Sequence, residues 1–283
     1  MDISDIAVEE FVEVEADTRV AKVRSRFERE NPKGIVVMDD GDCIGVIREK
    51  QLIQSHVEDD TKVGAIVRSS RSGGNAPSVR RYDDVREVCR VLVEGDVKIA
   101  PVYEGENLWG IVAADDILDA VHENLEAITV GDIASESVVT VLEDDHVGKA
   151  INRLRENGVS RLPVVNESGE LTGIVTTNDI VNFAVRDEER QGEGDRSGEL
   201  DRMLDIPVYD LMSSPVQTIT SGETVDEAVS VMFENNISGL VVTATPDGSE
   251  IEGVITKTDV LRALTHTEEE SMDVQITNTN LLD

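Results

Sequence analysis

The sequence predicts an α/β (α+β) fold in which four small sheets, flanked by helices, come from four repeats of one unit. Three observations predict it. A glycine-led apolar segment occurs four times, an apolar stripe with helical spacing precedes each copy, and a short run of β-forming residues lies between them. The 283 residues suffice for about two domains of ordinary size, so the four units are expected to form two tandem pairs.

The glycine-led segment defines the repeat. Its four copies align without gaps, and their glycines lie 65, 63 and 80 residues apart. The copies are Gly45–Leu52, Gly110–Ile117, Gly173–Ile180 and Gly253–Val260. The longest interval contains residues 186–202, whose charge, glycines and lack of apolar periodicity predict a linker. Without these 17 residues the interval is 63, so a single period describes the chain.

Each repeat shows the same order of elements. Apolar residues at positions i, i+3, i+4 and i+7 predict a helix, although the first repeat has Arg24 at its i+4 position. The stripes are Val20, Val23 and Phe27; Val85, Val88, Cys89 and Leu92; Val147, Ala150, Ile151 and Leu154; and Val225, Ala228, Val229 and Met232. Strands are expected at 34–38, 99–103, 162–165 and 240–243, each followed by a turn, the glycine-led strand and a second helix. Each unit is too small to bury both faces of its sheet, so neighbours are expected to pair.

The repeats divide the chain into two pairs and a tail. The expected N-terminal pair spans 1–125, and the expected C-terminal pair spans 126–264. The repeats are expected near 1–60, 61–125, 126–185 and 203–264, with the acidic linker 186–202 between the last two. In the tail, 265–283, apolar and polar residues alternate from Met272 to Thr277, which is a strand pattern. That strand is expected to extend a sheet edge, to mediate dimerisation, or to begin a further segment.

The charge of the chain excludes several classes of function. Asp and Glu number 59 against 26 Lys and Arg, so the formal net charge is −33. Such a chain repels nucleic acid phosphates and anionic membrane surfaces, so binding to either is not expected. Only 7 of the 26 basic residues are Lys, and the acidic excess is spread along the whole chain. This composition resembles that of halophilic, haloarchaeal proteins, whose carboxylates keep the surface soluble in concentrated salt. An ordinary acidic cytosolic protein is the alternative.

The sequence indicates neither secretion nor a membrane anchor. The two cysteines, Cys43 and Cys89, form no disulfide framework, and Cys89 is expected in the core because it lies in an apolar helical stripe. No stretch approaches about 18 apolar residues, and the N-terminus lacks the pattern of a signal peptide. A cytoplasmic location is therefore expected.

The order of elements, the period of about 60 residues and the pattern apolar-Gly-apolar-apolar-Thr-x-x-Asp-apolar resemble the cystathionine-β-synthase (CBS) domain. The resemblance covers nearly the whole chain as four copies, strongest in the third and fourth and weakest in the first. It implies that two repeats pack sheet to sheet as one module, that two modules form a flat disc, and that clefts between repeats bind adenine nucleotides or related adenosyl ligands. The chain is similar in plan to stand-alone archaeal members of the family and to the nucleotide-sensing γ subunit of AMP-activated kinase.

The chemistry of the repeat is expected at the turn from the glycine-led strand into the second helix. Free N–H groups and a partial positive charge at a helix start suit a phosphate, to which a Thr hydroxyl adds a donor. An Asp three residues later can accept two hydrogen bonds from the 2′,3′-diol of a ribose. The candidate nucleotide-binding residues are Thr176 with Asp179, Thr256 with Asp259, and Thr258 as a further contact.

A helix cap is the alternative interpretation of the same pattern. Thr-x-x-Asp before an apolar run is also a capping motif, and a capping Asp contributes about 1 kcal/mol. The first two repeats depart from the pattern. The second keeps Asp116, also a candidate ribose contact, but has Ala113 at the Thr position, while the first has Arg48 and Gln51 at the two positions. The C-terminal pair is therefore expected to bind the nucleotide more tightly than the N-terminal pair.

Cations for a phosphate are scarce in this chain. Arg161 is the main candidate, because its segment resembles the His-Arg-Leu-Pro-Val segment whose basic residues meet nucleotide phosphates in the kinase γ subunit. That resemblance implies that Arg161 lies in the cleft of the partner repeat and faces the site of Asp259. The alternative is that Arg161 forms a surface salt bridge. Arg68 and Arg71, in a basic segment, are secondary candidates, with a mobile surface loop as the alternative.

No motif predicts catalysis or a metal site. The four histidines are far apart in sequence, and no zinc-ligand spacing, P-loop or nucleophile elbow occurs. The leading prediction is a non-catalytic regulatory module that binds an adenosine-containing ligand, has no covalent cofactor and signals to a partner protein, with a homodimer as one expected assembly. The alternatives are a structural adaptor with vestigial sites and an enzyme related to inosine monophosphate dehydrogenase.

Overall fold

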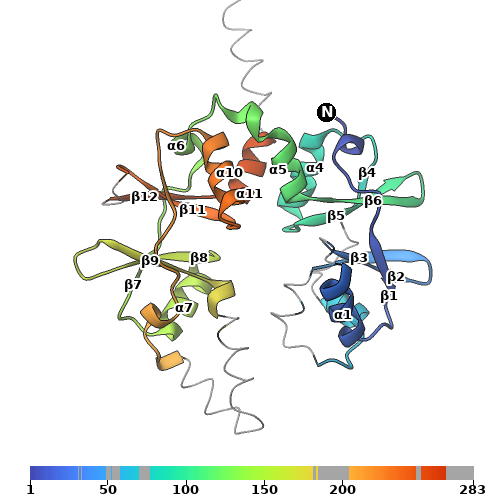
Figure 1. The fold of residues 1–283 in the computed structure, drawn as a ribbon, viewed down its shortest axis with the longest axis horizontal. Coiled ribbons are helices and arrows are strands. Elements are labelled where there is room, and N and C mark those ends of the chain that lie inside the picture. Colours follow the sequence, from blue (N-terminus) through green and yellow to red (C-terminus); the bar gives the residue numbers. More distant parts are fainter. Residues whose placement is uncertain are drawn as a thin grey trace, which may run out of the picture. The chain divides into compact units, whose positions relative to one another are not determined.

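The structure is a computed structural model, and its ribbon is drawn in Figure 1. It describes residues 1–30, 32, 34–48, 52, 58–69, 77–180, 183, 204–246 and 250–265, with only the backbone described at 68, 69, 123 and 124. The predicted linker 186–202 and nearly all of the predicted tail therefore lie outside the described residues.

Four small sheets with flanking helices confirm the predicted fold class. The first repeat has β1 (Val12–Glu15), α1 (Val20–Glu30), β2 (Ile35–Asp39) and β3 (Asp42–Ile47). The second has β4 (Val79–Arg80), α4 (Val85–Glu94), β5 (Ile99–Glu104), β6 (Asn107–Ala113) and α5 (Ala114–Val121). The third has β7 (Val141–Leu142), α7 (Val147–Asn157), β8 (Arg161–Val165) and β9 (Leu171–Thr176), followed by helical residues at 177–180. The fourth has β10 (Thr218–Thr220), α10 (Val225–Glu234), β11 (Gly239–Thr243), β12 (Ile251–Thr256) and α11 (Lys257–Leu264).

All four sheets have the same topology. The first strand is parallel to the second, and the second is antiparallel to the third. A bulge interrupts the antiparallel pair immediately after the residue that pairs with the repeat glycine, for example after Val102, the partner of Gly110. The bulge follows Val37, Val164 and Val242 in the other repeats.

The predicted helical stripes face the cores. Every stripe residue except Ile151 is buried, including Cys89, which is fully enclosed. Burial among apolar neighbours raises the pKa of the Cys89 thiol to about 12, because an enclosed site disfavours the thiolate. Each core is thus built from the apolar face of one helix and one face of a three-stranded sheet.

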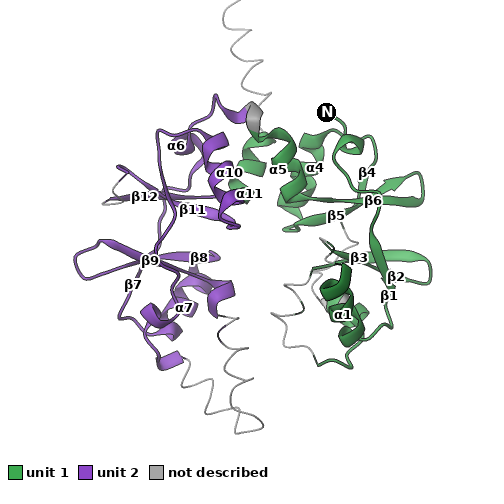
Figure 2. Cartoon of the chain, viewed as in Figure 1, with its two compact units in different colours: residues 1–52, 57–124, 257–283 green, residues 53–56, 125–256 purple. Residues whose placement is uncertain are grey.

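The chain forms two compact units, shown in Figure 2. Unit 1 comprises residues 1–52, 57–124 and 257–283, and unit 2 comprises 53–56 and 125–256. In unit 1 the sheets of the first two repeats pack face to face through Val36, Ile99 and Ile111. Helix α11 follows the last strand of the fourth repeat but belongs to unit 1, where it packs against α4 and α5 of the second repeat.

Leading segments are exchanged between the two repeats of a unit. Helix α3 (Val63–Ser69), which begins the second repeat, contributes Val63 and Ile66 to the core of the first. The short turn η1 (Ile3–Asp5), which begins the first repeat, binds the second, where Ile3 N–H donates to Asp83 O at 3.0 Å. Each repeat therefore completes the core or sheet of its neighbour.

The same exchange occurs in unit 2. Helix α6 (Val130–Ile133), at the start of the third repeat, contacts β10 and β12 of the fourth. The turn η3 (Val208–Asp210), at the start of the fourth repeat, places Val208 in the core of the third, next to Leu211. A single repeat would leave its own leading segment without a core to pack on.

The exchanged segments explain two of the repeat glycines, Gly110 and Gly253. A Cβ on Gly110 would lie 2.7 Å from Val8 O, and a Cβ on Gly253 would lie 3.0 Å from Ser135 O. Val8 and Ser135 belong to the leading segments of the first and third repeats, and each forms a β-bridge with the residue after the glycine. Because backbone passes directly over these positions, a side chain there would displace the exchanged segment.

Candidate functional site

Arg161 crosses from the third repeat to the fourth within unit 2. It begins β8 and stands opposite Thr176 in the β8–β9 pair. Its Nη2 donates to Ser238 Oγ at 3.0 Å, and its guanidinium lies over Gly239, the first residue of β11. Gly239 is in turn opposite Thr256 in the β11–β12 pair. The half-buried Arg161 thus lies near the strand ends that carry both candidate threonines.

The position of the Arg161 side chain requires a glycine at residue 239. A Cβ at this position would lie 2.8 Å from Arg161 Cζ and 2.7 Å from Ile255 O. Both distances are shorter than real Cβ atoms show, so the guanidinium could not keep its position over a larger residue. The Ser-Gly sequence at 238–239 therefore forms the surface on which an arginine from the neighbouring repeat packs.

Thr176 and Asp179 form a reciprocal capping box at the end of β9. Asp179 Oδ2 accepts from Thr176 N–H at 2.8 Å and from Thr176 Oγ1 at 2.6 Å. Asp179 N–H in turn donates to Thr176 Oγ1 at 3.3 Å. Among the described residues, these bonds use one carboxylate oxygen, Oδ2, and Oδ1 is the atom that can meet a ribose hydroxyl.

The same box occurs where no ligand is predicted. Asp132 Oδ2 accepts from Thr129 N–H at 2.9 Å and from Thr129 Oγ1 at 2.7 Å, at the start of α6. The hydrogen bonds from Thr129 lower the pKa of Asp132. Thr224 and Glu227 form an equivalent box at the start of α10. Helix capping is therefore sufficient to explain the geometry of Thr176 and Asp179, and a ligand role needs independent evidence.

The candidate residues of the fourth repeat lie at the junction between β12 and α11. Thr256 ends the strand, and Thr258 and Asp259 lie in the first turn of the helix. Arg262 Nη1 donates to Asp259 Oδ1 at 2.8 Å, an exposed i,i+3 pair of small energetic value. Thr258 Oγ1 accepts from Lys98 Nζ of the second repeat at 2.6 Å.

The second repeat contributes Asp115 and Asp116 in the first turn of α5. Asp116 is partly exposed, and Asp115 Oδ1 lies 3.1 Å from Lys257 Nζ. Arg48, at the Thr position of the first repeat, lies near Asp115 and Asp96. Burial lowers the pKa of Arg48 despite the opposing attraction of these two carboxylates, so Arg48 is an enclosed group.

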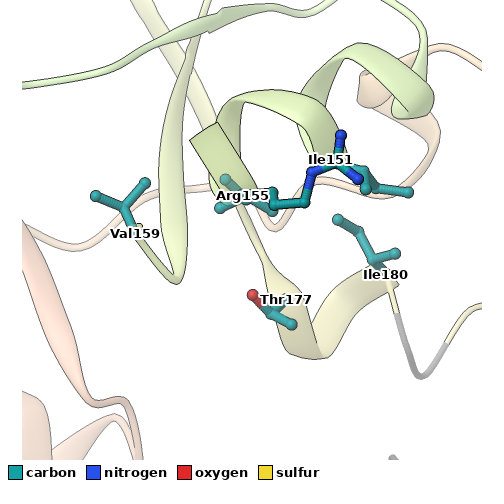
Figure 3. A pocket seen from close by; sticks show the side chains of 6 residues that line it. Ile151, Arg155, Val159, Thr177 and Ile180 are labelled. Carbon is teal, nitrogen blue, oxygen red and sulfur yellow. The ribbon is translucent and has the colours of Figure 1, made fainter. Parts of the chain in front are cut away.

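A small cavity of about 300 Å³ lies on the helical side of the third repeat (Figure 3). It is lined by Ile151, Leu154, Arg155, Val159, Thr177 and Ile180. All six residues come from one repeat, so this cavity is not the predicted cleft between repeats. Its lining is mostly apolar, and its volume is at the lower end for a small-molecule pocket.

Three predicted positions cannot be compared with the structure. Gln51 and Arg71 lie outside the described residues, and the side chain of Arg68 is also outside them. Sequence reasoning, on the other hand, did not single out Lys98 and Lys257. Their rarity was the available signal, because the chain holds only 7 lysines. Their approach to Thr258 and Asp115 depends on tertiary packing.

The described residues hold neither a cluster of metal ligands nor a helix suited to a membrane. No three His, Cys, Asp or Glu side chains within the described ranges gather as metal ligands would. Among the helices of that part of the chain, none has the length and apolar character needed to cross a membrane.

The chain belongs to the CBS domain family. The family model matches four segments, residues 3–58, 63–123, 130–186 and 208–266, which together contain most of the sequence. Among curated proteins, the uncharacterized protein MJ1404 of Methanocaldococcus jannaschii is 24% identical over 266 residues, covering 92% of this chain and 61% of the relative. A 33.4 kDa protein encoded in the ribosomal RNA operon of Thermofilum pendens is 31% identical over 191 residues and is also covered to 61%. This chain thus spans about three fifths of the length of these relatives.

Two solved structures share the fold along almost the whole chain. Protein MJ1225 of Methanocaldococcus jannaschii, described as a candidate archaeal homologue of the γ subunit of AMP-activated kinase, gives a TM-score of 0.69. It is 20% identical, with coverage of 93% of this chain and 99% of that protein. A conserved protein of Pyrococcus horikoshii gives 0.65 at 21% identity, with coverage of 93% and 100%. These similarities show that the chain shares the fold of these two proteins along almost its whole length.

Proposed function

We propose that this protein is a non-catalytic regulatory sensor that binds adenosine-containing ligands in the clefts between its CBS repeats. The observation that carries the proposal is the position of Arg161. A cation from the third repeat lies over Gly239 and bonds Ser238 of the fourth, next to the strand end that carries Thr256. A phosphate held there would contact both repeats at once, so ligand binding would change how the two repeats pack.

The remaining contacts follow from the chemistry of the side chains. Asp179 Oδ1 and the carboxylate of Asp259 would accept from a ribose diol, as would Asp116 in the second repeat. Thr176 and Thr256 would donate to a phosphate, with the helix start that follows each strand as a further source of N–H donors. Thr176, Asp179 and Thr256 lie in unit 2 together with Arg161, whereas Asp116 and Asp259 lie in unit 1.

The change in packing would be read by another protein. A ligand that prefers one arrangement of the repeats shifts the population toward it, and a partner that binds the same arrangement senses the ligand. We infer that this signalling takes place in the cytoplasm, with a homodimer as one form of the protein.

We also infer a haloarchaeal origin and halophilic adaptation from the net charge of −33.

Calorimetry with the full chain tests the proposal. AMP, ADP, ATP, S-adenosylmethionine and methylthioadenosine would be titrated in concentrated KCl. Asp179→Asn is expected to weaken binding about 10-fold or more, because it replaces a charged acceptor of the ribose by a neutral one. The matched control is Asp132→Asn, which alters the same Thr-x-x-Asp capping box at the start of α6 and is expected to leave affinity unchanged.

A structural adaptor is the second candidate, favoured by the capping geometry of Thr176 and Asp179. If no ligand in the panel binds, the adaptor is the better description. Equal effects of Asp179→Asn and Asp132→Asn on binding would contradict the ribose contact assigned to Asp179. The similarity to inosine-5′-monophosphate dehydrogenase of Korarchaeum cryptofilum reaches 33% identity over 140 residues but covers only 29% of that protein. Because the match covers so little of that enzyme, its activity is not assigned to the present chain.

A further inference from the structure

The outer edge of β3 in the first repeat differs from the equivalent edge of the other three repeats. In those repeats the residue after the repeat glycine forms a β-bridge with a leading segment. The three bridges join Val8 to Ile111, Ser135 to Val254, and Ser213 to Ile174. Each consists of two backbone hydrogen bonds, between 2.9 and 3.1 Å long. The equivalent residue of the first repeat, Val46, forms no bridge of this kind with any described residue.

Val46 has the two backbone groups that such a bridge needs. It stands opposite Val36 in β2, as Ile111 stands opposite Pro101 in β5. In an antiparallel pair, a residue directs its N–H and C=O either both toward the paired strand or both away from it. Because Ile111 directs both groups to Val8, the equivalent Val46 directs both toward the outer edge of β3. The half-buried Val46 therefore presents a donor and an acceptor at an edge that no described strand covers.

The leading segment next to this edge is α3, which begins the second repeat and contacts β3. Its first residues dock on the first repeat through Val63 N–H, which donates to Thr18 O, and Gly64 N–H, which donates to Ala16 O, both at 2.9 Å. The first two residues of α6 donate in the same way to the fourth repeat, at 2.8 and 2.9 Å. Val67 is still buried in the core of the first repeat. Up to this residue, α3 docks as the other leading segments do.

The segments differ at the next residue. In three repeats the bridging residue lies five positions after the first residue of the leading turn: Val8 after Ile3, Ser135 after Val130, and Ser213 after Val208. The same spacing from Val63 gives Arg68. The other leading turns end after three or four residues, but α3 continues for seven, through Arg68 to Ser69. Because a bridge needs extended backbone, the helical Arg68 does not pair with Val46.

Two conformations of Arg68 are close in their number of hydrogen bonds. In the helical form, the backbone of the last turn of α3 bonds within the helix. In the extended form, Arg68 would leave that turn and exchange two backbone hydrogen bonds with Val46, as Val8 does with Ile111. Because bonds of the same kind replace one another, a small difference in free energy decides which form is populated. The end of a short helix is also among the parts of a protein that open most easily.

We propose that the last turn of α3 is a conformational switch in which Arg68 is either helical or bridged to Val46. The bridged form completes the sheet of the first repeat in the way that the other three sheets are completed. The helical form leaves the edge of β3 open, and an open strand edge can pair with another chain. The switch therefore controls whether this edge is available, and it does so without a bound nucleotide, so it is independent of the proposed function.

Hydrogen exchange measured by NMR at single amides of the full chain tests the switch. In the wild-type chain, the Val46 amide is expected to exchange faster than the bridged Val254 amide but more slowly than an unstructured amide. Ser69→Pro is expected to slow exchange at Val46 at least about 5-fold, the factor that corresponds to the net stability of one backbone hydrogen bond. The proline disfavours helical backbone at the preceding Arg68 and leaves the N–H of Arg68 in place.

Glu136→Pro is the matched control. Glu136 follows Ser135 as Ser69 follows Arg68, but Ser135 is already bridged to Val254. The control is therefore expected to leave exchange at both Val254 and Val46 unchanged. A melting curve of each variant shows that the chain is folded.

Each result decides the proposal. A wild-type Val46 amide that is as protected as the Val254 amide would mean a permanent bridge, and one that exchanges like an unstructured amide would mean a permanently open edge. Either result overturns the switch, whether or not Ser69→Pro folds. Unchanged exchange at Val46 in a folded Ser69→Pro chain would show that Arg68 does not reach this edge, and that any strand that pairs there comes from another chain. Intermediate exchange in the wild type, slowed by Ser69→Pro and not by Glu136→Pro, supports the switch.

Discussion

Arg161 and Gly239 show how a single missing side chain sets the position of a charged group. The guanidinium occupies space that a Cβ on Gly239 would fill, so this contact between repeats requires both the arginine and the glycine. The sequence placed Arg161 among the candidate phosphate ligands by its resemblance to a family segment. No feature of the sequence indicated that Arg161 packs over Gly239.

At Gly239, substitution by alanine is expected to destabilise the protein by about 1–3 kcal/mol, because the added methyl overpacks a filled site. Gly222→Ala is the control, since a Cβ at that position would have no neighbour within 4 Å, and its effect is expected to stay within about 0.5 kcal/mol. Urea unfolding of both variants measures the difference. Equal stability of the two variants would contradict the described position of the Arg161 side chain.

The two cysteines are expected to react at different rates. Burial raises the pKa of Cys89 to about 12, so almost no thiolate forms at pH 8 while the protein is folded. Cys43 is only partly buried and is expected to be alkylated first. Mass spectrometry after timed treatment with iodoacetamide checks the order, and both thiols should react in denaturant. Fast modification of Cys89 in the folded chain would show that its helix opens readily.

At the scale of elements, exchange of leading segments is the main organising feature. Apolar periodicity placed the long helices and the last two strands of each repeat correctly, because those elements bury a face against their own sheet. The short elements η1, α6 and η3 were not predicted. They contain three or four residues and pack on the neighbouring repeat, so no local pattern distinguishes them.

Ile3 tests this exchange. It is fully buried although it lies in a three-residue turn next to the N-terminus. Ile3→Ala is expected to lower the free energy of unfolding by about 2–5 kcal/mol, as for other buried Ile residues. Tyr82→Ala, at a side chain in the same unit that is 63% exposed, is the control and is expected to change stability little. A neutral effect of Ile3→Ala in denaturant unfolding would mean that the leading segment contributes no core.

At the scale of the whole molecule, α11 links parts of the chain that are far apart in sequence. Its buried residues Val260, Leu261 and Leu264 lie in a helix that packs against α4 and α5. A cut between the predicted pairs, at 125/126, would therefore separate α11 from the helices that cover it. The boundaries of the pairs remain a prediction, and ligand binding is better compared in the full chain than in separate halves.

Co-expression of residues 1–125 and 126–283 is expected to give a one-to-one complex, because α11 keeps its apolar partners only when both fragments are present. Expressed alone, the C-terminal fragment is expected to be less soluble. Size-exclusion chromatography with light scattering measures both outcomes. Leu261→Asp in the C-terminal fragment should abolish the complex. Two fragments that stay monomeric and soluble when mixed would contradict the described packing of α11.

Thermal stability is expected to rise between about 0.1 M and about 1 M KCl, since salt screens the repulsion among the excess carboxylates. The net charge of −33 is the reason to expect a strong effect. A series of melting curves by circular dichroism provides the measurement. A melting temperature that is constant or falls across the series would reject halophilic adaptation.

The sequence by itself determined the repeat, the order of the main strands and helices, and the residues that face each core. These depend on short-range periodicity and turn chemistry, which are local properties of the chain. The candidate pair Thr176 and Asp179 was likewise correctly located at the end of β9 and the helical turn that follows.

Tertiary structure decided the rest. Only the folded chain shows that Val8 and Ser135 pass over the repeat glycines, that Arg161 reaches Gly239, and that Lys98 meets Thr258 across 160 residues of sequence. These contacts arise when separate repeats complete one another's cores and sheets. Their partners are set by packing between distant segments, and no periodicity within a single repeat encodes them.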